Sequence, residues 1–209
     1  MLGLSLTNLF SKKEDQGGSA TYTFGRPHNN LSNLLPVPVV YGNMRLYGNV
    51  VYNNATTLSS FDRAIALAQG PLASVSDIRF NNNAVASYPG CSATAYSGTA
   101  EQTNDERLVT YRGSLKNVAY IAATAVASDS LAGDPVVSAE VEGKIIYDPY
   151  LPGSSGPSRN PAMIARDILI NQVGLLSADL DEDSFEDVAG YCDAVVTGDD
   201  VERKKPFPD

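Results

Sequence analysis

The chain has little of the chemistry on which most enzymes depend. Its 209 residues contain one histidine, two cysteines and no tryptophan. His28 lies in a turn-rich Arg-Pro-His-Asn-Asn context without a GxSxG elbow, so we expect an exposed loop histidine rather than a catalytic one. Cys91 and Cys192 do not suffice for a structural zinc site with a single histidine. We expect both to be reduced and mostly buried, with a disulfide between them as the alternative.

Long apolar runs are also absent. The longest, residues 118–127, is about half the length that a membrane-spanning helix needs. Residues 1–10 are apolar, but Lys12 and Lys13 follow them, whereas a secretory signal carries its basic residues in front. The sequence therefore predicts no export signal and no stable membrane insertion.

The charge of the chain is concentrated near one end. The net charge is −9, and residues 177–209 contribute −8 of it, from 11 acidic and 3 basic side chains. No basic cluster of the kind that binds phosphate backbones occurs, and neither does a GxxxxGK[ST] or GxGxxG loop, so no nucleic-acid binding is expected. Acidic segments of this kind serve solubility or meet a basic partner surface.

Two groups of carboxylates resemble known sites without matching them. Asp179, Asp181 and Asp183 have the spacing of a calcium loop, but Ser184 and Gly190 stand where that loop needs glycine and glutamate, and an acidic helix N-terminus explains them as well. Glu140 and Glu142 lie on one side of a predicted strand, as the exposed face of any such strand does. The tyrosines are scattered and are expected to pack. We therefore assign no catalytic, cofactor-binding or metal-binding residues, and no cofactor.

Most of the chain has the pattern of short strands separated by turns. Glycine (17) and proline (12) are frequent, and apolar residues alternate with small or polar ones. Residues 60–69 also have helical composition, but we expect them to pair as a hairpin with 75–80 across Gly70-Pro71. A turn or bulge at Gly42-Asn43 is expected to join the first two strands, and residues 81–106 to form a long loop with at most a fragment of strand. The expected strands are 37–41, 44–52, 60–69, 75–80, one within 111–127, and a half-exposed one at 136–147. Because Pro36 and Pro38 cannot donate to a ladder, we expect 37–41 to be an edge strand or an entry segment.

Two helices are expected after a Pro/Gly/Ser loop at 148–158. The first begins at the N-cap Asn160 with Pro161 in its first turn, and Gly174 ends it. Its apolar face is expected to contain Ile164, Ile168 and Leu169. The second helix begins near residues 181–184 and reaches Val196, and its apolar stripe is expected to contain the following residues: Phe185, Val188, Ala189, Cys192, Val195 and Val196. The fold class is α+β and mainly β, divided into a lead-in (1–33), a β-rich domain (34–150) and a loop with a helical segment and an acidic C-terminal part (151–209).

Four segments, in this order, resemble the tail hub or tail tip attachment (host-specificity) proteins of long-tailed bacteriophages and gene transfer agents. Their patterns are "PIPxVYGxxRxxGNV", "ALCEGPI…I…I…N", "YRG" with "RGRKVYDP", and "NPAxxxxDxL…G…YCD". The corresponding residues here are 35–51, 64–81, 111–113 with 142–149, and 159–193. The resemblance thus covers residues 34–196.

The resemblance implies a virion structural protein without catalytic activity. In that family three copies form a ring of β-barrel domains at the distal end of the tail, which implies an antiparallel barrel-like hub domain, a homotrimer, and a place in the tail tip or baseplate. The implied partners are the distal tail protein, the tail tube or tape-measure protein, and receptor-binding or fibre proteins that attach to the host.

The chain departs from the family pattern in two respects. Ala68 and Gln69 replace the usual Cys and Glu, and family members continue for several hundred residues beyond the "YCD" helix, so we expect a short form or one piece of a divided hub. Two other functions stay open on the sequence. One is a β-rich binding module, such as an adhesin or carbohydrate-binding domain, and the other is a tail-associated cell-wall hydrolase, for which no acid/base or metal group is found.

Overall fold

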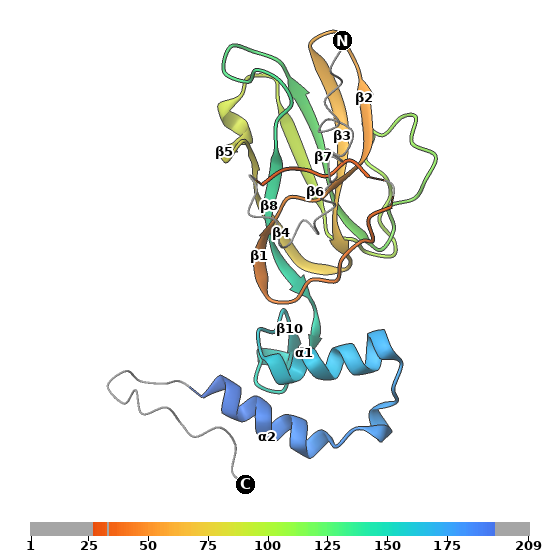
Figure 1. The fold of residues 1–209 in the computed structure, drawn as a ribbon, viewed down its shortest axis with the longest axis vertical. Coiled ribbons are helices and arrows are strands. Elements are labelled where there is room, and N and C mark those ends of the chain that lie inside the picture. The colour runs from red at the N-terminus through yellow and green to blue at the C-terminus, as the bar shows by residue number, and fades with distance from the viewer. Residues whose placement is uncertain (1–26, 33, 195–209) are drawn as a thin grey trace, which may run out of the picture.

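A computed structural model describes residues 27–32 and 34–194. They form a lead-in (27–42), a β sandwich (43–147) and a smaller helical unit (148–194) at one end of the sandwich (Figure 1). The rest of the lead-in predicted for 1–33 and the acidic part after residue 194, including Val195 and Val196 of the predicted stripe, lie outside these residues. Within them, no helix is both long and apolar enough to cross a membrane.

The sandwich consists of two antiparallel four-stranded sheets, in the orders β1-β8-β4-β5 and β2-β3-β7-β6. The predicted class, mainly β with two C-terminal helices, is confirmed. The described strands do not close into a barrel, although Leu72 N–H donates to the Ser97 carbonyl (2.8 Å) where the two sheets approach each other. The strands are β1 (Asn43–Leu46), β2 (Asn49–Ala55), β3 (Ser60–Gln69), β4 (Leu72–Phe80), β5 (Asn83–Ala84), β6 (Ser92–Tyr96), β7 (Val118–Val126) and β8 (Val137–Lys144).

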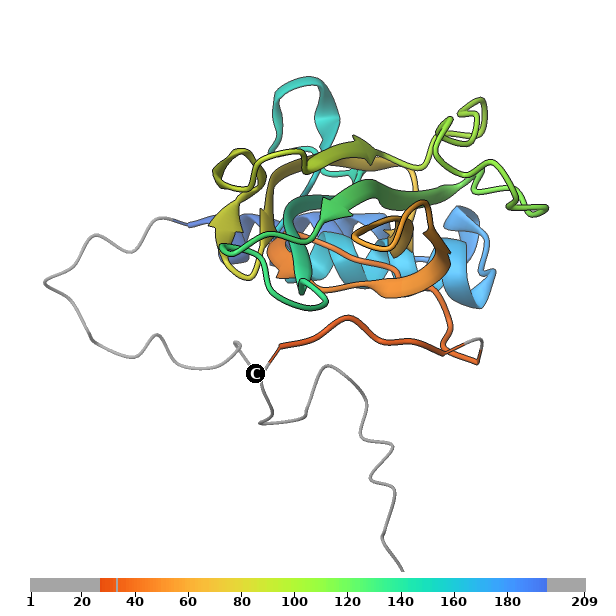
Figure 2. The ribbon, with the colours of Figure 1, turned by 90° about the horizontal axis from the view of Figure 1, so that it is seen from above.

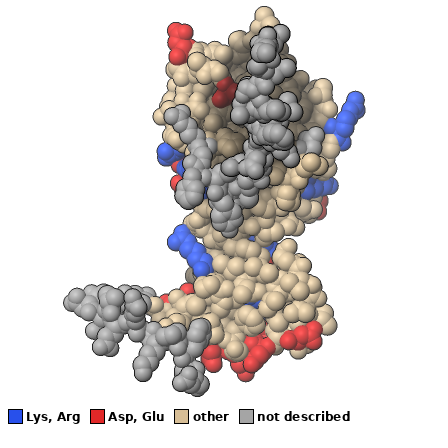
Figure 3. Space-filling model, viewed as in Figure 1, with Lys and Arg blue, Asp and Glu red and all other residues tan. Residues whose placement is uncertain are grey.

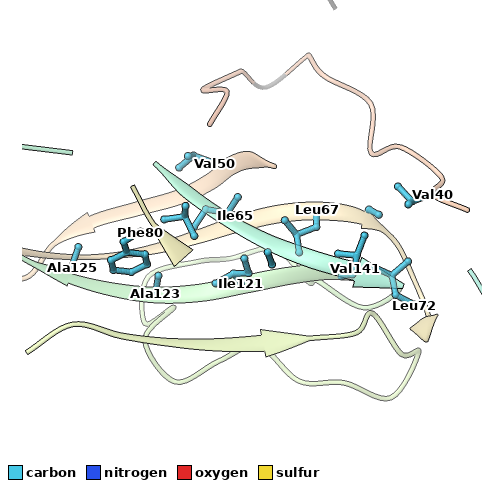
Figure 4. Packing of buried hydrophobic residues seen from close by; sticks show 14 of the residues in the cluster. Val40, Val50, Ile65, Leu67, Leu72, Phe80, Ile121, Ala123, Ala125 and Val141 are labelled. Atoms are coloured by element: carbon cyan, nitrogen blue, oxygen red, sulfur yellow. The ribbon is translucent and has the colours of Figure 1, made fainter. Parts of the chain in front are cut away.

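The main core lies between the two sheets. Ile65, Leu67 and Ile121 of one sheet meet Phe80 and Val141 of the other, and all five side chains are buried (Figure 4). Each such side chain contributes about 1.5–3 kcal/mol by leaving water. This interface accounts for the period-two pattern of the strands, because every second residue faces it.

Strands β3 and β7 are buried on both faces, which explains why they read as nearly continuous apolar runs. On the side away from the main core, a loop over residues 97–117 covers them, and its Leu108 and Leu115 pack on Ala64, Tyr120 and Ala122. The loop projects from the side of the sandwich in two perpendicular views (Figures 1 and 2). A doubly buried strand needs no polar face, so Ser60–Gln69 forms a strand despite its helical composition.

Several predicted pairings are wrong because the chain changes sheets where a hairpin was expected. Strands β3 and β4 follow each other across Gly70-Pro71 but belong to different sheets. The single strand predicted at 44–52 is divided at Tyr47-Gly48 into β1 and β2, and this crossing too moves the chain from one sheet to the other. A Cβ atom on Gly48 would lie 2.3 Å from the Ala66 carbonyl oxygen, so only glycine fits this crossing.

Residues 37–41 form no strand and are the entry segment that was the second of the two predicted possibilities. Pro38 within this stretch and Pro36 before it cannot donate hydrogen bonds to a ladder. Only its end runs along β8, where the Lys144 amide donates to the Val40 carbonyl (2.8 Å) and the Gly143 amide to the Gly42 carbonyl (2.7 Å). The predicted strand fragment inside 81–106 is confirmed as β6, and the half-exposed strand at 136–147 as β8.

A short hairpin of β9 (Ile146–Tyr147) and β10 (Ser155–Gly156) joins the sandwich to the helical unit. Helix α1 (Pro161–Ile168) continues as a wider π-helical turn (Leu169–Val173), and α2 spans Glu182–Asp193. The Asn160 N-cap is confirmed, since its side chain accepts from the Ala162 amide at 3.1 Å, and so is the end of the first helix at Gly174. Asp181 caps α2 through the Ser184 amide (3.3 Å).

The predicted apolar faces of the two helices are partly wrong. The buried side chains of α1 are Ala162, Met163 and Asp167, whereas Ile168 is 38% exposed. In α2, Phe185, Val188 and Ala189 pack as predicted, but Cys192 is exposed. Each of these short helices packs on one side only and therefore buries a narrow stripe of side chains. The spacing of apolar residues in the sequence does not determine which of two adjacent stripes is buried.

Candidate interaction surface

The residues considered for catalysis or metal binding have structural contacts instead. His28 is exposed in the lead-in, as predicted. Glu140 accepts a hydrogen bond from Arg45 (3.1 Å), and Glu142 accepts one from the hydroxyl of Ser74 (3.0 Å). Both glutamates lie on the outer face of the sheet, and each is engaged with a neighbouring strand rather than with a cleft.

The acidic triplet forms the approach to helix α2. Asp181 is the N-cap, the Asp179 carboxylate accepts from the Leu176 amide (3.3 Å), and Asp183 lies in the first helical turn. Among residues 27–32 and 34–194, no three histidine, cysteine or acidic side chains are grouped as metal ligands. This arrangement is the helix N-terminus that the sequence offered as the alternative to a calcium loop.

Both cysteines are free thiols. Cys91 is half-buried, and its sulfur accepts from the Val126 amide at 3.3 Å. Cys192 is exposed, so the expectation that both would be mostly buried is wrong for it, because the last turn of α2 extends past the helix that it packs on.

Most tyrosines of the sandwich pack, as predicted: Tyr52, Tyr88, Tyr96, Tyr111 and Tyr120 belong to the two hydrophobic clusters of the sandwich. Tyr96 and Tyr120 stack at 4.5 Å with an interplanar angle of 3°. The Tyr96 hydroxyl donates to Asp105 (2.8 Å), and the Asp105 amide donates to the Tyr120 hydroxyl (2.9 Å). Burial, followed by this hydrogen bond to Asp105, raises the pKa of Tyr96 to about 12. The pair therefore fixes the 97–117 loop on the sheet.

A buried carboxylate joins the helical unit to the sandwich. Asp167 of α1 accepts hydrogen bonds from the Tyr41 hydroxyl (2.7 Å), from Nζ of Lys144 (2.7 Å) and from the side chain of Asn171 (2.8 Å). Burial acts to raise the pKa of Asp167, but the hydrogen bonds from Lys144 and Tyr41 outweigh it and hold this pKa below its usual value. The lead-in, β8 and α1 thus meet at one ion pair that is shielded from water.

The two helices are held together at both ends. At one end Asn160 donates to the Ala189 carbonyl (2.9 Å) beside the small core of Ile146, Met163 and Ala189. At the other, the Arg166 guanidinium makes two bonds to Glu182 (2.5 and 2.7 Å). The hydrogen bonds from Arg166 lower the pKa of Glu182 to about 2. These contacts hold the two helices together as one packed unit.

Two clusters of large apolar side chains remain exposed. The lead-in patch comprises Leu31, Leu34, Leu35 and Val37, and Leu34 is 93% exposed. The helix-tip patch comprises Val173, Leu175 and Leu176, where the chain turns between the two helices, and Leu176 is 68% exposed. Clustered exposed apolar residues mark surfaces that contact other molecules more often than single ones do.

The helix-tip patch borders a strongly acidic edge. Between residues 174 and 194 the chain has seven acidic side chains and no lysine or arginine. Acidic atoms line the end of the helical unit that faces away from the sandwich (Figure 3). Apart from Glu182, which pairs with Arg166, these carboxylates have no salt bridge to a described residue. Such an edge favours a partner with basic groups.

Sequence reasoning missed the residues that matter most for this architecture. Tyr41 and Asp167 are 126 positions apart, and nothing in their local patterns indicates that they touch. Asn29 was treated as part of a turn-rich lead-in, yet its side chain binds the Tyr47 carbonyl and both backbone groups of Val137, each at 2.7 Å. The only sequence signal for the first pair was that each residue lies in a segment resembling the tail hub family.

Comparison with known proteins gives little further information. No protein-family model matches the sequence, and no curated protein matches it. Among solved structures, a chain described as "Virion of native gene transfer agent (GTA) particle" is similar, with a TM-score of 0.47 and 19% identity. The similarity covers 76% of this chain and 42% of that one, so this chain spans less than half the length of its neighbour. A likeness at this level does not establish a common fold, and the family stays a prediction.

Proposed function

We propose that this protein is a structural subunit of a phage-type virion, located in the hub of the tail tip. The observation that carries the proposal is the hydrogen bond between Tyr41 and Asp167. Tyr41 belongs to the "VYG" segment and Asp167 to the "NPAxxxxDxL" segment of the family resemblance. Both segments match the family patterns in sequence, independently of any contact between them.

A third segment of the resemblance converges on the same junction. Gly143 and Lys144, within the segment that resembles "RGRKVYDP", contact the lead-in and Asp167 respectively. Unrelated matches scattered over 160 residues have no reason to meet in space, whereas motifs maintained by a common architecture do. The convergence supports a shared hub-type junction between the sandwich and the helical unit.

The surface properties support a role in assembly. The lead-in patch and the helix-tip patch expose apolar side chains to water. Contact with water is unfavourable for such side chains, and a protein that works alone gains nothing from exposing them. A subunit that meets sister copies and other tail proteins covers such surfaces. We infer a homotrimer that contacts the distal tail protein, the tail tube or tape-measure protein, and receptor-binding or fibre proteins.

The same proposal makes the protein non-catalytic and independent of cofactors. The carboxylates singled out from the sequence serve as strand contacts and helix caps, and the tyrosines with strongly raised pKa values are packing residues. A tail-associated cell-wall hydrolase would need at least one of these groups to face an open cleft.

Native mass spectrometry of the purified chain tests the proposal. We expect a trimer at micromolar concentration, or its formation when the distal tail protein of the same virus is added. Labelling the protein in purified particles should place it at the distal end of the tail. A chain that stays monomeric with and without the distal tail protein, and that is absent from particles, would contradict the proposal.

Surface variants distinguish assembly from non-specific association. Leu34→Ser with Val37→Ser removes two of the four side chains of the lead-in patch, and Val173→Ser with Leu176→Ser removes two of the three side chains of the helix-tip patch. At least one pair should weaken trimer formation by about tenfold or more, since one buried leucine contributes more than 1.4 kcal/mol. Leu58→Ser is the matched control, because Leu58 is fully exposed alone at the tip of the β2–β3 turn.

A further inference from the structure

A cavity of about 370 Å³ lies at the end of the sandwich where the lead-in begins. Its walls are Pro27 of the lead-in, Tyr47 between β1 and β2, Asn81 and Asn82 after β4, and Val136 before β8. These residues come from four separate segments, and the volume is within the range of pockets that bind small molecules.

The walls of this cavity are fixed by hydrogen bonds. Asn81 and Val136 form a reciprocal pair, in which the Asn81 amide donates to the Val136 carbonyl and the Val136 amide donates to Oδ1 of Asn81, both at 2.9 Å. Asn29 holds Tyr47 and the start of β8 together from behind, through three bonds of 2.7 Å. A pocket whose walls are already ordered loses little conformational entropy when a ligand binds.

Among the described residues, the side chains that line the cavity are neutral, and three of their polar groups have no hydrogen bond to another described residue. These are the Tyr47 hydroxyl, the side-chain amide of Asn82 and Nδ2 of Asn81. Asn81 and Asn82 both adopt left-handed backbone conformations (φ 48° and 68°), which asparagine tolerates better than most residues. The described lining thus combines a phenol with amide donors and acceptors, and the guanidinium of Arg79, which donates to the Asn82 carbonyl (3.3 Å), is the charged group beside it.

We propose that this cavity is a binding subsite for one neutral sugar residue. Sugar hydroxyls both donate and accept hydrogen bonds, as the amide of Asn82 does, and the Tyr47 ring supplies the apolar surface on which a pyranose face packs. Phosphorylated or acidic sugars fit less well because none of the described lining side chains is positively charged, and the nearby Arg79 guanidinium is already engaged with Asp77 and the Asn82 carbonyl. An open site of this size binds weakly, with a dissociation constant on the order of millimolar. The inference does not depend on the assembly role proposed above.

Chemical-shift titration of the full-length protein with methyl glycosides of glucose, galactose and N-acetylglucosamine tests the proposal. At least one glycoside should shift the backbone amide signals of Tyr47, Asn81 and Asn82 in a saturable manner, and glucose 6-phosphate should bind at least about tenfold more weakly. The proposal is overturned if none of the neutral glycosides shifts these signals, or if the phosphorylated sugar binds as tightly.

Two variants connect the signal to the cavity. Asn82→Gly removes the amide while keeping a residue that accepts a positive φ, and Tyr47→Ala removes the phenol. Each should weaken glycoside binding by about tenfold, the loss expected for one good hydrogen bond or ring contact. Asn117→Gly is the matched control, since Asn117 has a similar φ of 58° in the turn before β7, outside the cavity, and should bind as the wild type does. Unchanged affinity in both cavity variants would refute the assignment.

Discussion

Replacing Gly143 by alanine is the sharpest test of how the lead-in and the sandwich fit together. Gly143 lies in β8 on the same face as the buried Val141, two residues earlier. A Cβ atom at position 143 would lie 2.5 Å from the Val40 carbonyl oxygen and 2.7 Å from Cα of Tyr41. Because both contacts are with backbone, no side-chain rotation relieves them, and the lead-in has to move away from β8.

The cost follows from two contributions. Overpacking a well-packed site costs about 1–3 kcal/mol. Displacing the lead-in also weakens the two hydrogen bonds that it accepts from β8, at 2.7 and 2.8 Å, each of which contributes about 0.5–1.5 kcal/mol. Because these costs overlap, we expect the free energy of unfolding to fall by roughly 2–4 kcal/mol. For a chain of this length that corresponds to a melting temperature lower by about 4–16 °C.

Urea unfolding followed by circular dichroism measures this loss, with Gly156→Ala as the control. The nearest atom to a Cβ on Gly156 is a methyl group of Leu151 at 3.1 Å, at the movable end of a side chain, so this variant should change stability by less than about 1 kcal/mol. Hydrogen exchange should show that Gly143→Ala exposes the amides of Gly143 and Lys144. If Gly143→Ala is as stable as the control and keeps these amides protected, the close fit between the lead-in and β8 is wrong.

Three further substitutions test the junctions described above. Asn160→Ala removes the N-cap of α1 and the bond to α2, so it should lower stability by about 1–3 kcal/mol in urea unfolding, and a loss no larger than that of an exposed asparagine would contradict the capping role. Tyr120→Phe leaves the Asp105 amide without its acceptor and should cost about 1–3 kcal/mol in urea unfolding, whereas Tyr47→Phe, whose hydroxyl has no hydrogen bond to a described residue, should cost almost nothing. The pKa of Asp167 is lower in the folded state than in the unfolded chain, so the stability that it contributes is present above about pH 4 and is lost as the pH falls through the folded-state pKa. Asp167→Asn should therefore be less stable than the wild type at pH 7 and approach it in acid, and a constant difference between pH 7 and pH 2 would refute the ion-pair account.

Local patterns in the sequence were sufficient for most of the strands and for both helices but not for how the strands pair. Alternation identified β8, and capping residues identified the start of α1, because both signals depend only on near neighbours. No comparable local signal in the sequence shows to which of the two sheets a strand belongs. A strand after Gly70-Pro71 has the same pattern of buried residues whether it folds back on β3 or crosses to the opposite sheet, since both arrangements face the same core.

The candidate surfaces were harder to predict for a related reason. Exposure of Ile168 depends on which stripe of α1 packs, and exposure of Cys192 depends on how far α2 extends beyond α1. Both are properties of the assembled helical unit. The cavity beside Tyr47 and Asn82 is formed by four segments that are distant in sequence, and the sequence placed Tyr47 within the predicted strand at 44–52 and Asn82 in the predicted loop at 81–106. Asparagine is common in turns because of its backbone preference. The sequence therefore gives no reason to assign its side chain a binding role until the neighbouring residues in space are known.

The junction at Asp167 links the fold to the proposed role in a way that a packing contact would not. A charged group enclosed by Tyr41 and Lys144 is costly to bury unless all its partners are in place, so the helical unit has one favourable position on the sandwich rather than a range of them. An apolar contact of similar area would allow sliding and rotation at little cost. A subunit that must present a lead-in patch on the sandwich and a helix-tip patch on the helical unit to different neighbours needs the two at a constant separation. The ion pair supplies that constraint, and it predicts that Asp167→Asn weakens assembly even at temperatures where the variant is fully folded.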